Sequence, residues 1–312
     1  MKRIILAGGK GFLGCALTEH FSRAGYEVAV LSRTPQRATN AVREILWDGC
    51  SLGDWANEVE GANVVINLTG RSVNCRYNER NRRLILDSRV NSTRVLGQAI
   101  AQCKKPPAVW LNASTATIYQ HTFGQAWTET GRIASTPEAK DAFSVHVATS
   151  WERAFEEAKT PQTRKVMLRA AMVLGTGKNS VFPTLRTLVR LGLGGRMGNG
   201  LQFVSWIHES DFCRAIEWVI ERPTFHGPVN ICAPNPLPNT DMMKILRKIY
   251  GMPIGLPATE WMLDIGAFIL RTETELMIKS RKVVPAKLIE SGFNFEFPIF
   301  KQAVENLKGK AN

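Results

Sequence analysis

The stretch "LAGGKGFLG" at residues 6–14 places a glycine-rich turn directly after an apolar run. The run at 4–7, "IILA", has the length and branching of a buried strand. Residues 15–25 have helical spacing, with Leu17 and Phe21 on one face. A strand, a glycine turn and a helix in this order predict a phosphate site at the first turn of the helix.

The glycines of this turn have a spacing that favours a dinucleotide. Gly8, Gly11 and Gly14 form G-x-x-G-x-x-G, a variant of the dinucleotide fingerprint, and Phe12 and Leu13 lie inside it. Glycine lets the backbone turn sharply and lets a pyrophosphate approach the amides without a Cβ in the way. A plain tight turn is the alternative for a glycine triplet alone. The flanking strand and helix favour the binding site, so we assign all five residues to the cofactor.

The end of the next apolar run indicates which dinucleotide binds. An NAD enzyme usually has an acidic residue here, about 20 residues past the glycines, whereas this chain has Ser32 and Arg33. A guanidinium can hold a 2′-phosphate that a carboxylate would repel. Lys10 and Arg37 add positive charge nearby. The sequence therefore predicts NADP as cofactor, with an ordinary surface role as the alternative for Arg33.

Composition limits the class of protein. The 312 residues contain six cysteines, which are scattered without a C-x-x-C pair, so no disulfide framework or metal site is indicated. The net charge is +13 and the pI is about 9.7. The basic residues are spread along the chain, and the densest patch, "RYNERNRR" at 76–83, has a single aromatic, Tyr77. We predict no nucleic-acid partner and interpret the charge as solvated surface plus attraction for anionic small molecules.

The apolar segments do not predict a membrane protein. The stretch "WMLDIGAFIL" at 261–270 is too short to span a bilayer and contains Asp264. The N-terminus leads directly into a strand without a cleavable signal pattern. We therefore expect no membrane contact and a cytoplasmic location.

Apolar runs suited to buried strands recur between helix-like segments, which predicts right-handed crossovers and a parallel sheet covered on both faces. The runs lie at 3–8, 27–33, 63–70, 108–115, 165–175 and 228–234. The fold class is α/β, a Rossmann-type doubly wound parallel sheet with a smaller C-terminal substrate lobe. The NADP-binding domain is expected at 1–174, with 204–232 returning to it, and the lobe at 175–312.

Longer motifs resemble a known superfamily over nearly the whole chain. The glycine turn is joined by "NLTG" at 67–70, "NASTATIY" at 112–119, "LRAAMVLG" at 168–175 and "VSWIHESDFCRAI" at 204–216. Together they resemble the extended short-chain dehydrogenase/reductases, the superfamily of NAD-dependent epimerases and dehydratases. An atypical, sugar-nucleotide epimerase-like branch, also labelled cell-division-inhibitor-like, is more similar still. That closer similarity rests on "ILDSRVNSTRVL" at 85–96, "LGLGGRMGNGLQFVSWIH" at 191–208 and "ELMIKSRKVVPAKLIESGFNFEFP" at 275–298.

The resemblance implies a catalytic hydroxyl, a Tyr that moves the proton, and a Lys four residues later on the same helix face. Thr115, with Ser114 beside it, matches the hydroxyl position, and both are assigned as catalytic. Alignment on Glu152 places Ser144 and Ala148 where the Tyr and Lys should be. A methyl group cannot lower a phenol pKa, and the pKa of a serine hydroxyl is too high for a general acid near neutrality. The proton donor is therefore unassigned.

Three further cofactor residues follow from the resemblance. Arg89 replaces the usual Asn of the superfamily and would lie where nicotinamide and phosphates converge. It could contact the NADP phosphate and partly replace the missing Lys. A helix-surface arginine is the equally weighted alternative. Leu68 and Thr69 would line the adenosine and ribose side.

Other polar residues receive more ordinary assignments. Tyr119 is expected to pack near the substrate side, and Asp211 to cap the helix at 212–220. His146 is a candidate substitute acid, although a lone histidine is more often a surface or packing residue. Arg196, in a glycine-rich loop, could meet a substrate diphosphate, with a flexible surface loop as the alternative.

Two functions fit these features. The first is an NADP-dependent oxidoreductase or epimerase-like enzyme that acts on an anionic, nucleotide-linked small molecule. The second is a catalytically silent NADP(H)-binding sensor or regulatory protein that lost turnover with the Tyr-Lys pair. The resemblance allows a homodimer, an assembly that is common in the superfamily.

Overall fold

The predicted strand, turn and helix form the start of the fold. The computed structural model describes residues 2–35, 42–259, 262, 273 and 275–310. In it, β1 (Arg3–Ala7) leads through the glycine turn into α1 (Phe12–Arg23). Alternate residues of β1 point to opposite faces. Ile4 joins the core under α1, and Ile5 joins the core on the other face, so the strand is apolar throughout.

Seven parallel strands form the central sheet in the order β10-β6-β5-β4-β1-β2-β3. Besides β1 these are β2 (Glu27–Ser32), β3 (Val42–Leu46), β4 (Val64–Asn67), β5 (Val109–Thr115), β6 (Arg164–Ala170) and β10 (Gly227–Ile231). Strand order reverses beside β1, as in doubly wound sheets that bind ligands at the carboxyl ends of their strands. This topology confirms the predicted Rossmann-type α/β class.

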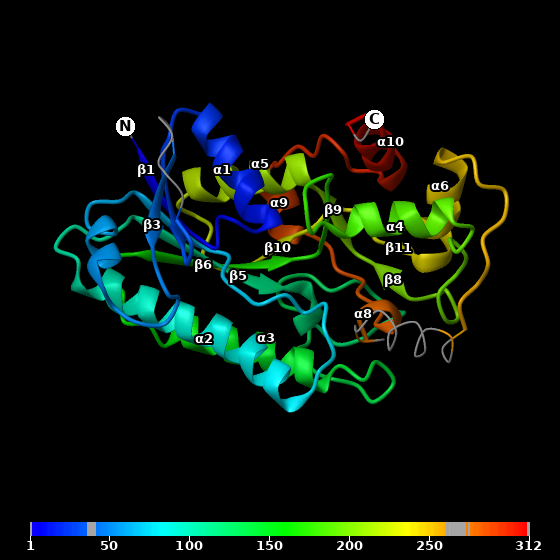
Figure 1. The fold of residues 1–312 in the computed structure, drawn as a ribbon, viewed down its shortest axis with the longest axis horizontal. Helices are drawn as coiled ribbons and strands as arrows, with labels where there is room; N and C mark the ends of the chain where they lie inside the picture. The colour runs from blue at the N-terminus through cyan, green and yellow to red at the C-terminus, as the bar shows by residue number, and fades with distance from the viewer. Residues whose placement is uncertain (1, 36–41, 260–261, 263–272, 274, 311–312) are drawn as a thin grey trace.

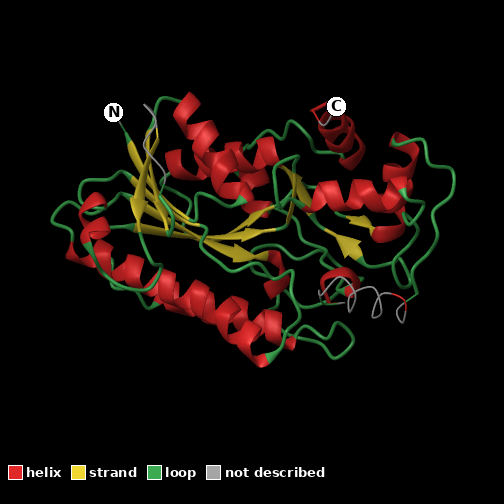
Figure 2. Cartoon of the chain, in the orientation of Figure 1, coloured by secondary structure: helices red, strands yellow, loops and turns green. Residues whose placement is uncertain are grey.

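Helices cover both faces of the sheet (Figures 1 and 2). One layer contains α1 and α5 (Glu209–Glu221), and the other contains α2 (Glu79–Gln102) and α3 (Ala142–Glu156). In the first layer Leu17 and Phe21 pack with Ile216, whereas in the second Leu96 packs with Phe155. The apolar periodicity of the sequence thus matches two cores, one on each side of the sheet.

Strand β3 was missed by the sequence analysis. Its residues are only partly buried, with Arg43 and Leu46 exposed, because it forms the edge of the sheet beside β2. A half-buried edge strand has no continuous apolar run, which is the signal that identified the other strands.

The run at 165–175 was interpreted as one strand, and the structure divides it in two. After β6 the backbone N–H of Ala171 donates to the Ile231 carbonyl, and the chain leaves the central sheet. The next residues form β7 (Met172–Leu174), which pairs in parallel with β9 (Trp206–His208). This small sheet leads from the sheet domain to the C-terminal lobe.

The lobe has a core of its own, formed by α4 (Val181–Arg190), α6 (Asn239–Ile249) and α10 (Phe300–Lys310). Figure 1 shows these helices beyond the ends of β5 and β6. The remaining elements are β8 (Phe203–Val204), β11 (Leu237–Pro238), α8 (Glu275–Ile278), α9 (Ala286–Glu290) and the 3-10 turns η1 (Asp54–Glu58) and η2 (Ala116–Ile118). The proposed domain boundaries stay a prediction.

Residues 279–284, which we call the strap, run through the middle of the molecule. The N–H of Arg281 donates to the Phe203 carbonyl at 2.8 Å, and the N–H of Trp127 donates to the Lys282 carbonyl at 2.8 Å. The strap therefore joins the loop after β5 to the lobe, a long-range contact that no local pattern indicates.

The expected cap of α5 is wrong. His208 caps the helix, because its Nδ1 accepts the N–H of Ser210 at 3.0 Å. Asp211 lies in the first turn and instead accepts the N–H groups of Glu296 and Phe297, at 2.9 and 2.8 Å. The carboxylate anchors the C-terminal segment.

No helix in the described ranges is long and apolar enough to cross a membrane. The apolar stretch at 261–270, including Asp264, lies outside the described residues except for Met262.

Candidate functional site

The glycine turn lies against the loop that follows β4. Gly8 has φ +81°, and a Cβ built on it would be 2.9 Å from the carbonyl carbon of Leu68. The N–H of Leu68 donates to the Ala7 carbonyl at 2.9 Å, which holds the two loops together. Glycine at position 8 is therefore needed both for its backbone angle and for space. The structure thus brings Leu68 and Thr69 beside the turn, and their contact with the adenosine and ribose stays a prediction.

Gly14 and Gly11 have different reasons to be glycine. A Cβ on Gly14 would lie 2.6 Å from the carbonyl carbon of Gly9, so the helix could not pack here with a side chain. Gly11 has φ −74°, and the nearest protein atom to its Cβ would be the Gly8 oxygen at an ordinary 3.5 Å. The fold does not require glycine at 11, and a side chain there would fill the space at the amino end of α1.

The amino end of α1 is suited to an anion. No side chain caps it, and its first turn contains no acidic residue. Free amides and the positive end of the helix dipole are the groups that bind a diphosphate. Phe12 packs against Gly177, where a Cβ would be 2.8 Å from the ring, and Leu13 packs on the core. The buried hydroxyl of Thr69 has no hydrogen-bond partner among the described residues. These features fit a dinucleotide.

The residues after β2 divide into buried and exposed. Ser32 is buried and its hydroxyl accepts the N–H of Thr34 at 3.2 Å, whereas Arg33 is exposed. Lys10 pairs with Glu44 at 2.9 Å and donates to the Thr34 carbonyl, so its charge is already partnered. Arg37 lies outside the described residues. Arg33 is therefore the candidate here for a 2′-phosphate.

Thr115 and Ser114 end β5, and their hydroxyls are placed differently. Thr115 is half-buried and its Oγ1 accepts the N–H of Thr117 at 3.1 Å. Ser114 is buried and its hydroxyl donates to Oε1 of Glu152 at 2.6 Å. Of the pair, Thr115 has the hydroxyl proton free to meet a substrate, while Ser114 belongs to a buried network.

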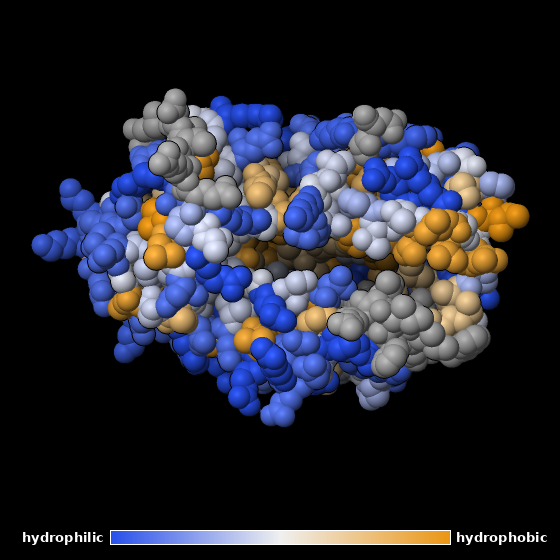
Figure 3. Space-filling view, in the orientation of Figure 1, coloured by the Kyte–Doolittle hydropathy of each residue, from blue (hydrophilic) through white to orange (hydrophobic). Residues whose placement is uncertain are grey.

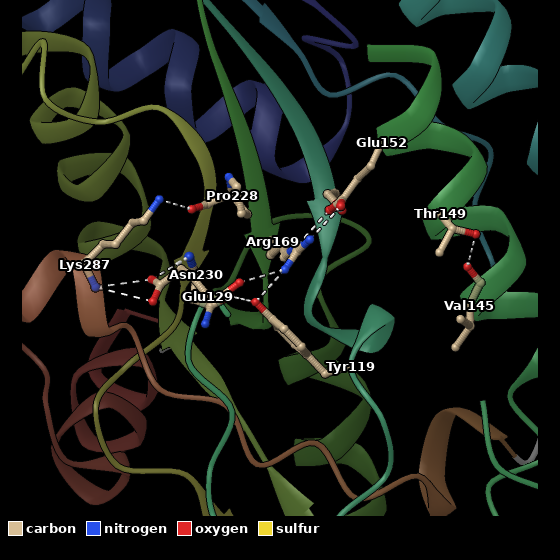
Figure 4. Close-up of polar contacts among 10 residues, drawn as sticks. Tyr119, Glu129, Val145, Thr149, Glu152, Arg169, Pro228, Asn230 and Lys287 are labelled. Carbon is tan, nitrogen blue, oxygen red and sulfur yellow. Dashed lines mark hydrogen bonds and ion pairs between the residues drawn. The ribbon is translucent and has the colours of Figure 1, made fainter. Parts of the chain in front are cut away.

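That network surrounds Arg169 (Figure 4). Arg169 makes a bidentate ion pair with Glu152, with nitrogen–oxygen distances of 2.8 and 2.7 Å. Its Nη1 donates to the Tyr119 hydroxyl at 2.9 Å, and Tyr119 donates to Oδ1 of Asn230 at 2.8 Å. Burial raises the pKa of Tyr119 to about 12. Tyr119 is therefore a buried packing residue of this network, and its place on the substrate side stays a prediction.

The face of α3 that should present Tyr and Lys is occupied differently. Ser144 is half-buried, and Ala148 is fully buried against Ile118 and Tyr119. His146 is exposed, which agrees with a surface residue. The exposed position of His146 therefore gives no support to its role as a substitute acid.

Arg89 reaches this face from α2. Its guanidinium lies 5.2 Å from the ring centroid of Trp151, and its Nη1 donates to the carbonyls of Ile85 and Arg71 at 2.9 and 3.1 Å. A Cβ on Gly70 would be 3.0 Å from Arg89 Cζ. Burial lowers the pKa of Arg89 to about 10. The cation thus lies between the β4 loop and α3, against Trp151, which follows Ala148 by three residues on α3.

The sequence analysis missed a cluster beside the amino end of α3. Tyr77 packs edge-on against Phe143 at 4.9 Å between ring centroids. Glu275 of α8 is buried, and the buried pair of Lys279 and Asp141 lies beside it. These residues are far apart in the sequence, and no motif joined them. The sequence analysis named Tyr77 only as the single aromatic residue of the basic patch at 76–83.

The glycine-rich loop around Arg196 is packed. A Cβ on Gly195 would clash with the backbone of Leu256, and the N–H of Gly198 donates to the Ala258 carbonyl at 2.8 Å. Packing therefore explains the glycines, and Arg196 itself is exposed. Its contact with a substrate diphosphate stays a prediction.

Figure 3 shows that the surface is hollowed near the centre of this face, between the layer of α1 and the layer of α2 and α3. The described residues contain no group of three or more acidic, His or Cys side chains placed to hold a metal ion.

Comparisons with known proteins agree with this arrangement. The family model described as "NAD dependent epimerase/dehydratase family" matches residues 4–232, and a domain of unknown function, DUF1731, matches 258–307. The epimerase family protein YfhF of Bacillus subtilis (strain 168) is 30% identical over 310 residues, which is 97% of each chain.

Two solved structures are also similar. Human epimerase family protein SDR39U1 (isoform2), solved with NADPH, has a TM-score of 0.85 at 27% identity and covers 98% of this chain and 99% of that chain. The nucleoside-diphosphate sugar epimerase from Corynebacterium glutamicum has a TM-score of 0.76 at 26% identity and covers 98% of this chain and 58% of that chain. These matches support the predicted nicotinamide dinucleotide cofactor. From its fold and from these matches, the chain belongs to the NAD dependent epimerase/dehydratase family.

Proposed function

We propose that this protein binds NADP(H) at the carboxyl edge of its sheet and transfers hydride to or from an anionic small molecule. The observation that carries the proposal is that the protein itself gives no reason for glycine at position 11. The backbone angle of Gly11 is ordinary, and no protein atom crowds the position of its Cβ. The space in front of α1 is the place a diphosphate would take. When bound, the nicotinamide supplies or accepts the hydride.

Different residues bind the diphosphate, the 2′-phosphate and the ribose of the cofactor. The amides of Phe12 and Leu13 face the diphosphate at the uncapped end of α1. Arg33, exposed after β2, holds the 2′-phosphate, and Ser32 fixes the turn. The unpartnered hydroxyl of Thr69 is available to a ribose.

The substrate oxygen is oriented by Thr115, whose hydroxyl proton is free at the end of β5. Ser114 supports this strand end through its bond to Glu152. The lobe beyond β5 and β6 provides the rest of the substrate site (Figure 1). A nucleotide-linked substrate is in keeping with the sugar-nucleotide epimerase at 26% identity.

Titration calorimetry with NADPH and NADH tests the cofactor site. We expect the chain to prefer NADPH, and Arg33→Ala to lose about tenfold to a hundredfold in NADPH affinity, because a charge-assisted phosphate contact contributes about 1.5–3 kcal/mol. NADH affinity should not change. Arg94→Ala, an exposed arginine on α2, is the matched control. Equal binding of the two cofactors would contradict the assignment of Arg33.

A second candidate, a sensor without turnover, is favoured by one observation: Ser144 and Ala148 cannot act as the Tyr-Lys pair. NADPH oxidation in the presence of candidate carbonyl compounds separates the two functions. Turnover that Thr115→Ala abolishes supports the enzyme, and tight NADPH binding with no turnover supports the sensor.

A further inference from the structure

The cluster at the amino end of α3 contains enclosed polar atoms without partners. The Tyr77 hydroxyl and Oε1 of Glu275 have no hydrogen-bond partner at normal distance among the described residues. Ser144 follows Phe143, the residue that contacts the Tyr77 ring, and its hydroxyl lowers the pKa of both Tyr77 and Glu275. The edge contact with Phe143 holds the phenol beside the first turn of α3. Three groups that can carry a proton therefore meet where the family has its Tyr.

Burial favours the proton-bound form of both acids in the cluster. It raises the pKa of Glu275 above its ordinary value, against the opposing charges of Arg281 and Lys279. It also raises the pKa of Tyr77 to about 12, so the phenol stays protonated near neutrality. The titratable groups that face these two come from several elements: Cys75, Arg89, Asp141, Lys279 and Arg281.

Part of this surrounding charge is already paired. Lys279 forms a buried ion pair with Asp141 and donates to the Thr117 carbonyl at 2.5 Å. Thr117 follows Thr115 by two residues, so the pair connects the cluster to the strand end that orients the substrate. The cluster therefore lies beside the proposed site of reaction.

We propose that Glu275 and Ser144 form the proton-transfer pair of this site, with the Tyr77 hydroxyl as positioning residue. The inference rests on the proposed function and assigns the proton carrier that the missing Tyr-Lys pair leaves open. Glu275 comes from the DUF1731 segment, so the C-terminal part of the chain supplies the acid that α3 lacks.

In a carbonyl reduction, Ser144 and Glu275 each give up one proton. The substrate carbon receives the hydride of the proposed function, and the carbonyl oxygen must receive one proton. The Ser144 O–H bond breaks as the substrate O–H bond forms, and the Ser144 oxygen takes the proton of the Glu275 carboxyl in the same step. Serine then never bears a full negative charge, so its high pKa is no obstacle. The Glu275 carboxylate regains its proton from solvent, and oxidation follows the reverse path.

The test requires no substrate, because the two forms of the cofactor differ in charge at the nicotinamide ring. A positive ring next to Glu275 lowers the carboxyl pKa, so NADP⁺ should release more protons on binding than NADPH does. Calorimetry in buffers of different ionisation enthalpy, over roughly pH 5 to 9, measures this difference. We expect a maximum approaching about one proton per site.

In Glu275→Gln we expect the difference to disappear while the affinity for both cofactors stays within about threefold. Tyr77→Phe should shift the pH of the maximum, because the phenol no longer faces the carboxyl. Glu290→Gln, at an exposed glutamate, and Tyr250→Phe are the controls and should match the parent chain. The Tyr250 hydroxyl is likewise enclosed and has no hydrogen-bond partner among the described residues. Thermal melting verifies that each variant is folded.

The outcomes separate the two proposals. This inference is overturned, and the proposed function stands, if both cofactors bind with no difference in proton release. The same holds if the difference in proton release persists in folded Glu275→Gln and its pH maximum does not move in folded Tyr77→Phe. Failure of the parent chain to bind either cofactor overturns the proposed function, and this inference with it.

Discussion

The glycine turn before α1 and the amino half of α3 serve the same edge of the sheet, and they are built from different chemical groups. At the turn, backbone geometry determines the site: Gly8 has a positive φ, and Gly14 touches backbone. At α3, side chains from distant segments determine it, including Arg89 and Glu275. A backbone site is retained when its glycines are retained, whereas a side-chain site can be rebuilt residue by residue.

The difference explains how the family fold can persist with Ser144 and Ala148 at the positions aligned with the superfamily's Tyr and Lys. The diphosphate side depends on amides that every sequence possesses, provided that no Cβ intrudes. The chemical side depends on functional groups, and Ala148 provides none. The three predictions that follow, in order of expected effect, probe the packing behind these two regions and then the turn itself.

The largest effect is expected from breaking the buried ion pair behind α3. Glu152→Ala leaves the Arg169 guanidinium buried without its carboxylate, which should cost about 3–5 kcal/mol of unfolding free energy. Urea denaturation measures the loss. Glu156→Ala, at an exposed glutamate of the same helix, is the control and should change stability by less than about 0.5 kcal/mol. Similar losses in both variants would mean that the network does not stabilise this region.

The second prediction concerns pH and the helix that packs behind α1. Burial lowers the pKa of His208 from 6.5 to about 4, so the unfolded chain binds a proton that the folded chain does not. This stability is therefore fully present above about pH 6.5 and is lost as the pH falls to about 4, by up to about 3 kcal/mol.

Denaturant unfolding at a series of pH values measures the slope. His208→Asn keeps a side chain that can cap α5 but cannot titrate, so the slope between these pH values should become shallower. His146→Asn, at an exposed histidine, should leave it unchanged. An equal slope in parent and His208→Asn would assign the acid sensitivity to other groups.

The smallest effect on stability, and the sharpest on function, comes from a matched pair of glycines in the turn. Gly14→Ala forces a Cβ against Gly9 and should cost about 1–3 kcal/mol. Gly11→Ala meets only ordinary contacts and should change stability by less than about 0.5 kcal/mol. It should nevertheless weaken NADPH binding by about tenfold or more. Melting and calorimetry on both variants give the comparison, and undiminished NADPH binding by Gly11→Ala would contradict the assigned diphosphate position.

Local patterns predicted most of the sheet and failed where burial was incomplete or contacts were distant. The strand at 109–115 was evident from its apolar run, whereas Val42–Leu46 was missed because an edge strand is exposed on part of its surface. Asp211 looked like a helix cap because it precedes an apolar helix, yet the helix starts earlier and His208 caps it. A cap depends on where the backbone turns, which the sequence gives only to within a few residues.

The sequence by itself determined the Rossmann-type sheet, the glycine turn, the basic residue after the second strand, and the presence of Ser144 and Ala148 at the positions aligned with the superfamily's Tyr and Lys. Each of these depends on neighbouring residues or on a short fixed spacing. Only the tertiary structure decided that Gly11 is free of packing constraints and that Tyr77, Ser144 and Glu275 meet. These contacts join segments almost 200 residues apart, and their formation depends on how the lobe and its strap close on the sheet, which no local periodicity encodes.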